Sequence, residues 1–264
     1  MKRWVGVALA TVMALGVAAC SGDDSTPEAA PEVTTNAPAL TLPPKPCGDD
    51  ELPAGTSWTA TAAIEGEVQV FDTPQETLSP SHTFTNPRLF NGDPNAKVPL
   101  VFLVKDTPDD ACDWVEVYLP VRPNGTTGYV KRSDVTVQNN PYRIEISLGA
   151  FNLKVFKSDE VIMDTTIAEA SENTPTPGGL YFTTELVKTP NPGGAYGPYA
   201  YGLSGFSEVL QTFNGGPGQL GIHGTNQPQL LGQKVSHGCI RMSNEDITEL
   251  AGILPLGVPV QINA

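Results

Sequence analysis

Two short stretches, residues 222–225 (IHGT) and residues 236–242 (SHGCIRM), hold two of the three histidines and one of the four cysteines of the chain. A cysteine thiolate attacks acyl carbonyls, but a free thiol is mostly protonated at neutral pH and needs a base within hydrogen-bond reach. Cys239 and the histidine of either stretch can supply the nucleophile and the base. Gly224 and Gly238 allow backbone N–H groups to approach a reacting oxygen, as an oxyanion site requires. The pattern therefore predicts nucleophilic catalysis on an acyl group.

The same residues resemble a known family. The HGT of residues 223–225 and the SHGCIRM of residues 236–242 are similar to the active-site signature of the YkuD-type L,D-transpeptidases of bacterial cell walls. The resemblance covers residues 142–263 and includes residues 174–182 (TPTPGGLYF), which are similar to the family's TP-x-G-x-(F/Y) turn before a core strand. The interval between the two stretches is shorter than usual, and Arg241 stands where several relatives carry asparagine. These departures concern substrate fine-tuning more than catalysis.

The resemblance implies acyl transfer. Cys239 is expected to be the nucleophile and His223 the general base, with a backbone carbonyl near Gly224 orienting the imidazole. Attack on a tetrapeptide stem of peptidoglycan releases terminal D-Ala and leaves a thioester, which the amine of a neighbouring stem converts into a 3→3 cross-link. With water as acceptor the same site is a carboxypeptidase, and attachment of other wall components is a further variant. No cofactor or metal is implied, and carbapenem-type β-lactams are expected to acylate Cys239.

The other side chains of the motif receive supporting roles from the same resemblance. The backbone amides of Gly238 and Cys239 are expected to hold the oxyanion, while His237 supports that turn and Ser236 fixes the loop. Arg241 departs from the family pattern, and its own chemistry leads us to expect that it pairs with a substrate carboxylate through charge-assisted, bidentate hydrogen bonds. A structural ion pair is the alternative role for this arginine.

Two other functions compete with this interpretation. A zinc hydrolase could use His223, His237 and Cys239 as ligands, but the sequence offers no fourth ligand and no glutamate at metalloprotease spacing. A non-catalytic, wall-binding lipoprotein is the second alternative, although the intact pair of His223 and Cys239 argues against it. The net charge of −14 argues against nucleic acid as a partner, because phosphate binding needs a basic surface.

The first residues are predicted to be an export signal rather than part of the fold. Residues 1–19 combine Lys2 and Arg3 with an apolar run that is short for a membrane span. Residues 17–20 (VAAC) resemble a lipobox, so Cys20 is expected to carry a lipid and to become the mature N-terminus. An uncleaved anchor or an ordinary secretory signal is the alternative. The chain is therefore expected outside the cytoplasm, lipid-anchored to the membrane and facing the cell wall.

Export to an oxidising compartment affects the interpretation of the remaining cysteines. With Cys20 assigned to lipid and Cys239 to chemistry, Cys47 and Cys112 remain, and we expect them to form a disulfide. Residues 20–56, rich in Pro, Ala, Thr and acids, are predicted to be a disordered tether between the membrane and the folded domains.

The composition favours a mainly β fold, because 26 glycines and 25 prolines suit short strands joined by turns. Residues 57–138 contain several short alternating runs, and residues 114–130 resemble part of a bacterial SH3-like domain. This small β-barrel is expected either to bind the wall or guide substrate, or to be a spacer that packs on the catalytic domain. Residues 141–263 form the expected catalytic domain, a YkuD-type β-sandwich with one or two short helices.

Local patterns predict individual elements of the catalytic domain. Strands are predicted at residues 143–148, 153–156, 161–168, 179–184, 218–223 and 258–262. A helix is predicted after a capping box at residues 243–246, with one apolar face formed by Ile247, Leu250, Ala251 and Leu254.

One long loop, rich in Gly, Pro and Tyr, is predicted at residues 191–205. A loop of this length is more often functional than not. Tyr199 and Tyr201, with Tyr196 and Tyr181, are expected either to line a substrate groove or to pack the loop against the domain.

Overall fold

The computed structural model describes residues 55–75, 79–90, 96–105 and 113–264. The signal peptide, most of the tether, the lipidation of Cys20 and the Cys47–Cys112 disulfide fall outside the described residues, and they stay predictions. The described residues all belong to one compact unit. None of the helices in the described part of the chain is long and apolar enough to cross a membrane.

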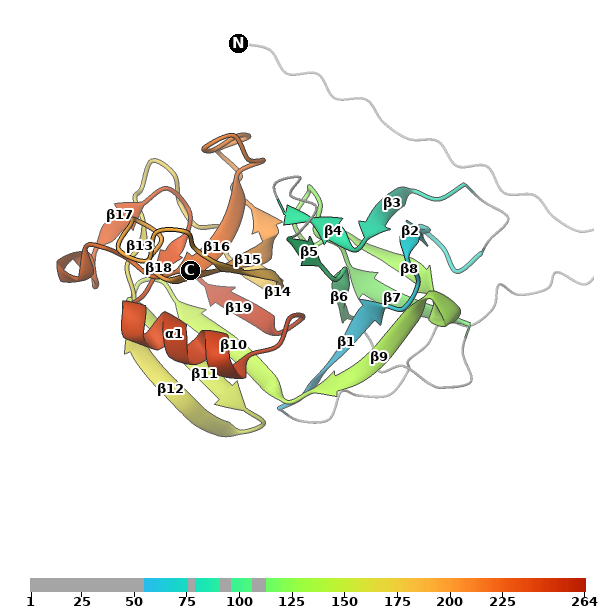
Figure 1. Ribbon diagram of the computed structural model, residues 1–264, viewed down its shortest axis with the longest axis horizontal. Coiled ribbons are helices and arrows are strands. Elements are labelled where there is room, and N and C mark those ends of the chain that lie inside the picture. The colour runs from blue at the N-terminus through green and yellow to red at the C-terminus, as the bar shows by residue number, and fades with distance from the viewer. Residues whose placement is uncertain (1–54, 76–78, 91–95, 106–112) are drawn as a thin grey trace, which may run out of the picture. The chain divides into compact units, whose positions relative to one another are not determined.

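The N-terminal sheet has five strands in the order β8-β7-β6-β1-β9 (Figure 1). Its strands are β1 (Ser57–Ala62), β6 (Val101–Val104), β7 (Trp114–Tyr118), β8 (Thr127–Lys131) and β9 (Val135–Asn140). Each pairs antiparallel with its neighbours, and Val68, Phe102 and Val115 are fully buried in the core of this part. Two short antiparallel pairs accompany the sheet, β2 (Gly66–Val70) with β3 (His82–Asn86) and β4 (Arg88–Leu89) with β5 (Lys97–Val98). The short alternating runs noted in residues 57–138 fall on strands of this part, and the likeness to SH3-like domains stays a prediction.

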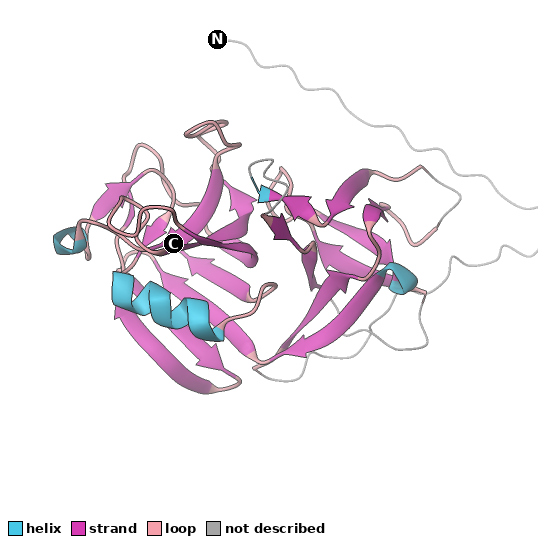
Figure 2. Ribbon diagram, in the orientation of Figure 1, coloured by secondary structure: helices cyan, strands magenta, loops and turns pink. Residues whose placement is uncertain are grey.

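The second part is built on an eight-stranded mixed sheet in the order β12-β11-β10-β19-β14-β15-β16-β18. Its strands are β10 (Tyr142–Ser147), β11 (Asn152–Lys157), β12 (Glu160–Thr166), β14 (Gly179–Lys188), β15 (Tyr199–Phe206), β16 (Gln219–His223), β18 (Ile240–Arg241) and β19 (Pro259–Asn263). The pairs β10–β19 and β16–β18 are parallel, and the other neighbours are antiparallel. A parallel pair of β13 (Glu169–Ala170) and β17 (Lys234–Ser236) lies outside this sheet. Strands dominate the described residues (Figure 2), so the predicted mainly β fold is confirmed.

The predicted helix is α1 (Asn244–Ile253). Ser243 is its N-cap, and the Ser243 side chain accepts a hydrogen bond from the Asp246 amide, as a capping residue should. The reciprocal half of the predicted capping box differs, because the Asp246 carboxylate accepts from the Thr165 hydroxyl at 2.7 Å. This acid therefore ties the helix to β12 rather than to its own first turn. Two short 3₁₀ turns are also present, Arg132–Asp134 and Pro228–Leu230.

The predicted loop at residues 191–205 is wrong in its second half, because β15 occupies Tyr199–Phe206. The glycines of β15 favoured the prediction of a loop, and the packing of this strand explains why glycine is needed there. A Cβ atom at Gly202 would lie 1.8 Å from Glu185 Oε1, and one at Gly205 would lie 2.3 Å from the Tyr181 ring. Glycine in a strand interior often marks such a close approach. The small residues therefore make room for side chains of the neighbouring strand β14.

Candidate active site

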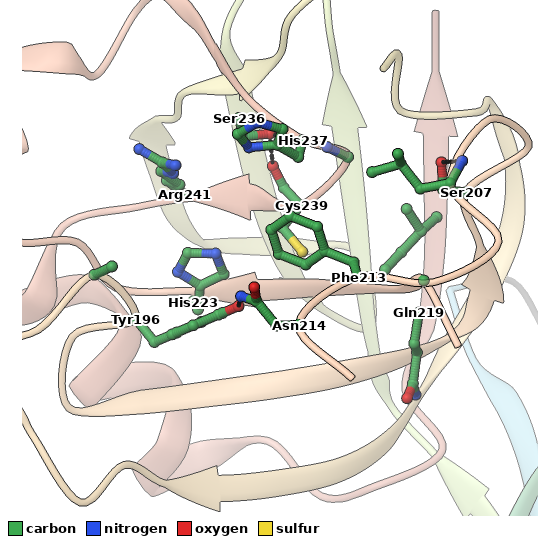
Figure 3. A pocket seen from close by; sticks show the side chains of 15 residues that line it. Tyr196, Ser207, Phe213, Asn214, Gln219, His223, Ser236, His237, Cys239 and Arg241 are labelled. Atoms are coloured by element: carbon green, nitrogen blue, oxygen red, sulfur yellow. Dashed lines mark hydrogen bonds between the residues drawn. The ribbon is translucent and has the colours of Figure 1, made fainter. Parts of the chain in front are cut away.

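Two adjacent parallel strands bring the predicted nucleophile and base together. In the pairing of β16 with β18, Ile222 lies opposite Ile240 and His223 lies opposite Arg241. Cys239 directly precedes β18, and side chains two apart along a strand face the same side. Figure 3 shows the His223 ring, the Cys239 sulfur and the Arg241 side chain around one cavity. The cavity has a volume of about 230 Å³. The pairing of β16 with β18 brings these residues together although they are far apart in the sequence.

The orientation of His223 is set by its own loop. The imidazole is buried, and its Nδ1 lies 2.6 Å from the Gly224 carbonyl oxygen. Because a carbonyl can only accept, His223 donates from Nδ1, and its Nε2 keeps the lone pair that a general base needs. This contact agrees with the predicted role of a carbonyl near Gly224.

Burial lowers the pKa of the His223 imidazole to about 4. The hydrogen bond to Gly224 opposes this shift, and the positive charge of Arg241 adds to it. His223 is therefore neutral at physiological pH and ready to accept a proton.

Cys239 is a half-buried free thiol. Burial raises the pKa of this thiol, and a hydrogen bond with the Gly221 backbone and the charge of Arg241 counteract the shift in part. A Cβ atom at Gly221 would meet the sulfur at 3.9 Å and the Tyr201 carbonyl at 2.9 Å, so glycine leaves room here for the strand backbone and the thiol. The pair rests as a neutral thiol and a neutral imidazole, and the proton has to move as the sulfur attacks.

The turn before the nucleophile is held by hydroxyl groups. Ser236 Oγ donates to the Cys239 carbonyl at 2.5 Å and accepts from the Gly238 amide at 3.3 Å. Thr176, from the TPTPGGLYF stretch, donates to the Gly238 carbonyl at 2.9 Å. Ser236 therefore contacts the loop in the way predicted for it. The predicted oxyanion role of Gly238 needs correction, because its N–H is directed at Ser236 Oγ, and the Cys239 amide remains the predicted donor.

His237 was predicted to support the turn that carries Cys239, and this role stays a prediction. It is exposed at the cavity, and its ring stacks on Phe213 with centroids 5.4 Å apart and planes 29° apart. Phe213 belongs to a segment that the sequence motif did not include. The histidine therefore contacts the opposite wall of the cavity.

Arg241 lines the cavity and makes no ion pair with any residue that the structure describes. Its Nε is buried without a hydrogen-bond partner there. A buried, unsatisfied charged donor is costly, and an incoming carboxylate would satisfy it. The substrate-carboxylate role is thus favoured over the structural ion pair.

Three of the four tyrosines considered for the groove have other positions. Tyr181 is buried in the core and lines neither of the two spaces beside Cys239. Tyr201 is 1% exposed, and its hydroxyl donates to the carbonyls of Leu250 at 3.0 Å and Leu254 at 3.1 Å. Although Tyr201 borders a second, larger groove beside Cys239, its side chain belongs to the core. Tyr199 packs against the same core and lines neither space. The structure therefore corrects the substrate-binding role predicted for Tyr199 and Tyr201.

Tyr196 is the tyrosine at the cavity. Its ring lies 4.7 Å from the His223 ring, and its hydroxyl accepts a hydrogen bond from the Asn214 side chain at 3.3 Å. Tyr196 and Asn214 both line the cavity (Figure 3). The sequence placed Tyr196 among the candidates, but it contained no signal that would rank it above Tyr199 or Tyr201, because the ranking depends on how the loop folds back.

Replacing Tyr201 with phenylalanine tests this correction. Loss of one buried hydrogen bond, which the single hydroxyl proton shares between two carbonyls, is expected to lower the free energy of unfolding by about 1 kcal/mol and to leave the KM for a stem-peptide donor unchanged. Urea denaturation and steady-state kinetics provide the two measurements. A clear rise in KM at unchanged stability would return Tyr201 to the groove.

Asn244 is a positioning residue that the sequence did not reveal. Its Oδ1 accepts a hydrogen bond from the Thr225 amide at 2.8 Å, and it would lie only 2.3 Å from a Cβ atom at Gly224. The first residue of α1 thus supports the loop whose carbonyl orients His223. Asn244 and Thr225 are 19 residues apart, and no local pattern links them.

The variants Asn244→Ala and Asn244→Asp separate this role from a helical one. Alanine removes the acceptor, and we expect kcat to fall by roughly 10- to 100-fold because the imidazole is less well positioned. Aspartate keeps an acceptor oxygen and suits a helix N-terminus, so it should retain most of the activity. Equal losses in both variants, measured by steady-state kinetics, would argue against the proposed contact.

A metal site finds no support in the described residues, where no three His, Cys, Asp or Glu side chains are grouped as ligands. The geometry instead defines a candidate thiol–imidazole site on a mainly β fold. Residues 141–262 match the family model of the L,D-transpeptidase catalytic domain, YkuD.

Curated relatives agree with the family match. Two proteins with the provisional name L,D-transpeptidase YkuD, from Bacillus licheniformis and Bacillus subtilis strain 168, are each 39% identical over 122 and 123 residues. The alignments cover 46% and 47% of this chain and 66% of either relative. A crystal structure of an L,D-transpeptidase from Mycobacterium tuberculosis H37Rv is 16% identical, with 55% of this chain and 75% of that chain covered and a TM-score of 0.39. The family and sequence matches support a YkuD-type L,D-transpeptidase catalytic domain over residues 141–262.

Proposed function

We propose that this chain is an L,D-transpeptidase that forms 3→3 cross-links in peptidoglycan through a thioester on Cys239. The observation that carries the proposal is the hydrogen bond from His223 Nδ1 to the Gly224 carbonyl, which leaves Nε2 as the free acceptor of a residue that lines the same cavity as the thiol. Cys239, His223 and Arg241 line one cavity on a YkuD-type domain, and Arg241 makes no ion pair within the part of the chain that the structure describes.

The first half-reaction acylates the cysteine. The Cys239 sulfur attacks the carbonyl of the L-configured centre of the diamino acid in a tetrapeptide stem, while His223 Nε2 takes the thiol proton. The Cys239 amide stabilises the oxyanion of the tetrahedral intermediate. The peptide bond to the terminal D-Ala then breaks, His223 returns the proton to the leaving amine, and a thioester remains.

The second half-reaction transfers the acyl group. The side-chain amine of a neighbouring stem attacks the thioester carbonyl, and His223 accepts the amine proton and restores the thiol. The thioester keeps the acyl group reactive enough for an amine to collect it. Water in place of the amine would give a carboxypeptidase, and an amine on another wall component would give an attachment reaction.

Arg241→Ala is expected to act mainly on binding. Loss of a charge-assisted pair with the substrate carboxylate should raise the donor KM by roughly tenfold, with a smaller effect on kcat. Arg241→Lys keeps the charge but not the bidentate geometry, so its donor KM should lie between those of the wild type and Arg241→Ala. A donor whose carboxylate is amidated provides the control, since its KM should be insensitive to the substitution. Equal sensitivity of both donors would contradict the pairing.

Incubation of the purified protein with defined muropeptides tests the proposal directly. Cross-linked dimers with loss of D-Ala support transpeptidation, whereas tripeptide stems alone would indicate carboxypeptidation. Formation of neither product and no covalent carbapenem adduct, with retained sedimentation on cell-wall sacculi, would favour the non-catalytic binder. Mass spectrometry of the intact protein detects the thioester and the adduct.

A further inference from the structure

One wall of the catalytic cavity is a loop that connects β15 to β16, residues 207–218, here called the wall segment. Phe213 at its tip stacks on His237, and Asn214 donates a hydrogen bond to the Tyr196 hydroxyl. Both lie at the cavity in Figure 3. The position of the wall segment therefore shapes the space beside the nucleophile.

The wall segment has few anchors of its own. Ser207 closes its base through its amide, which donates to the Gly218 carbonyl, and its Oγ accepts from the Leu210 amide. At the tip, the amides and carbonyls of Phe213 and Gly216 bond to each other. Val209 is 53% exposed, so little apolar burial holds this stretch in place. A loop of this kind is expected to open at low cost unless something else binds it.

Arg122, from the turn between β7 and β8 of the N-terminal sheet, supplies the missing anchor. Its Nη1 donates to the Pro217 carbonyl at 2.9 Å, and its Nη2 donates to the carbonyls of Ser207 at 3.0 Å and Leu210 at 3.1 Å. Its guanidinium also lies 4.7 Å over the Phe206 ring. One side chain thus joins the beginning and the end of the wall segment.

Asn124 extends the contact, because its side-chain amide makes a pair of hydrogen bonds with the backbone of Phe206. Its Nδ2 donates to the Phe206 carbonyl at 2.8 Å, and its Oδ1 accepts from the Phe206 amide at 2.9 Å. The turn that carries both residues is itself braced by Thr126, whose hydroxyl donates to the Pro123 carbonyl. The guanidinium holds its N–H donors in a fixed planar fork, and the amide both donates and accepts, whereas the three donors of a lysine ammonium radiate from one atom on a flexible chain.

We infer that Arg122 and Asn124 are positioning residues, through which the N-terminal sheet sets the wall segment for binding of the acyl-donor stem peptide. The inference rests on the proposed transpeptidase function for its substrate, but the contact itself does not depend on it. It assigns to the N-terminal part of the chain a task beyond that of a spacer. This part completes the donor site of the catalytic domain.

The test compares Arg122→Ala and Asn124→Ala with Arg143→Ala in the full chain. Arg143 is a matched control, because it also stacks on an aromatic ring, 3.8 Å over Phe156, and bonds Glu145, but it lies on β10 away from the cavity. Hydrogen exchange measured by mass spectrometry should be roughly tenfold faster in residues 207–218 of Arg122→Ala and unchanged in β10 and β11. The donor KM should rise roughly tenfold with a smaller change in kcat, whereas Arg143→Ala keeps both constants.

Arg122→Lys separates positioning from general stability. It retains the charge, cannot reach all three carbonyls in the same geometry, and should show intermediate exchange and KM at a melting temperature equal to that of the wild type. Wild-type exchange and KM in both Arg122→Ala and Asn124→Ala would overturn the inference. A loss of melting temperature with uniformly faster exchange would also overturn it, as it would show a merely structural role. If the wild type forms no product, the proposed function fails, while the exchange result still decides whether Arg122 holds the wall segment.

Discussion

Replacement of Cys239 by alanine is expected to abolish both the acyl-enzyme and the covalent carbapenem adduct, and to lower cross-linking by at least about 10⁴-fold. The reason is chemical, because no other nucleophile of the cavity has an adjacent neutral imidazole of fixed orientation. The fold should tolerate the change, since the thiol is only half-buried and alanine removes a single heavy atom. Intact-protein mass spectrometry before and after incubation measures the adduct.

The control for this prediction is peptide mapping of the modified wild type. The adduct should lie on the peptide that contains Cys239, which is the one free cysteine among the described residues. An adduct that persists at full yield in Cys239→Ala would place the reactive group elsewhere in the chain. Equal melting temperatures of the two proteins would show that the loss is chemical rather than structural.

Replacement of His223 by alanine is expected to slow acylation by roughly 10²- to 10⁴-fold, the range that a general base contributes. The imidazole both accepts the thiol proton and returns it to the leaving amine, so both half-reactions should suffer. Cavity access makes chemical rescue a sharp test, since added imidazole should restore part of the rate in His223→Ala but not in Cys239→Ala. Near-normal rates without rescue would show that another group is the base.

The pH profile gives the same residue a second signature. Because burial lowers the pKa of His223 to about 4, the base is lost by protonation only as the pH falls through that value. The kcat/KM for acylation should therefore hold a plateau from neutral pH down to about pH 5 and fall below it. An acid limb centred near 6.5, the ordinary value for histidine, would mean that the base is more exposed than the structure indicates.

Elements with a local pattern were predicted well. Alternating residues indicated the β10–β11 pair and the strand β16 that ends at His223, and Ser243 indicated the start of α1. The strand β15 was missed because Gly202 and Gly205 replace the large alternating residues that a strand usually shows. These glycines leave room for the side chains of Glu185 and Tyr181 on the adjacent strand. A short stretch of sequence does not contain this information.

The candidate site divides in the same way. The motif contained Cys239 and His223, which the pairing of β16 with β18 brings together, and the contact of His223 with the carbonyl of its chain neighbour Gly224. The motif did not reveal that the Gly238 amide donates to Ser236, because this hydrogen bond depends on the conformation of the turn. It did not reveal the role of Asn244 either, because this residue lies at the start of a helix that follows the motif. The choice of Tyr196 over Tyr201 also depended on burial, which the spacing of the tyrosines does not encode.

By itself, the sequence determined the chemical groups of this protein and their order, namely a thiol and an imidazole in a YkuD-type motif on a mainly β chain. Only the tertiary structure decided which groups are charged, paired or free. Burial sets the protonation state of His223, neighbouring strands leave Arg241 without a partner among the described residues, and Arg122 reaches the wall segment from another sheet. The physical reason is that the covalent structure of each side chain is written in the sequence, whereas its burial and its hydrogen-bond partners depend on contacts between residues far apart in the chain.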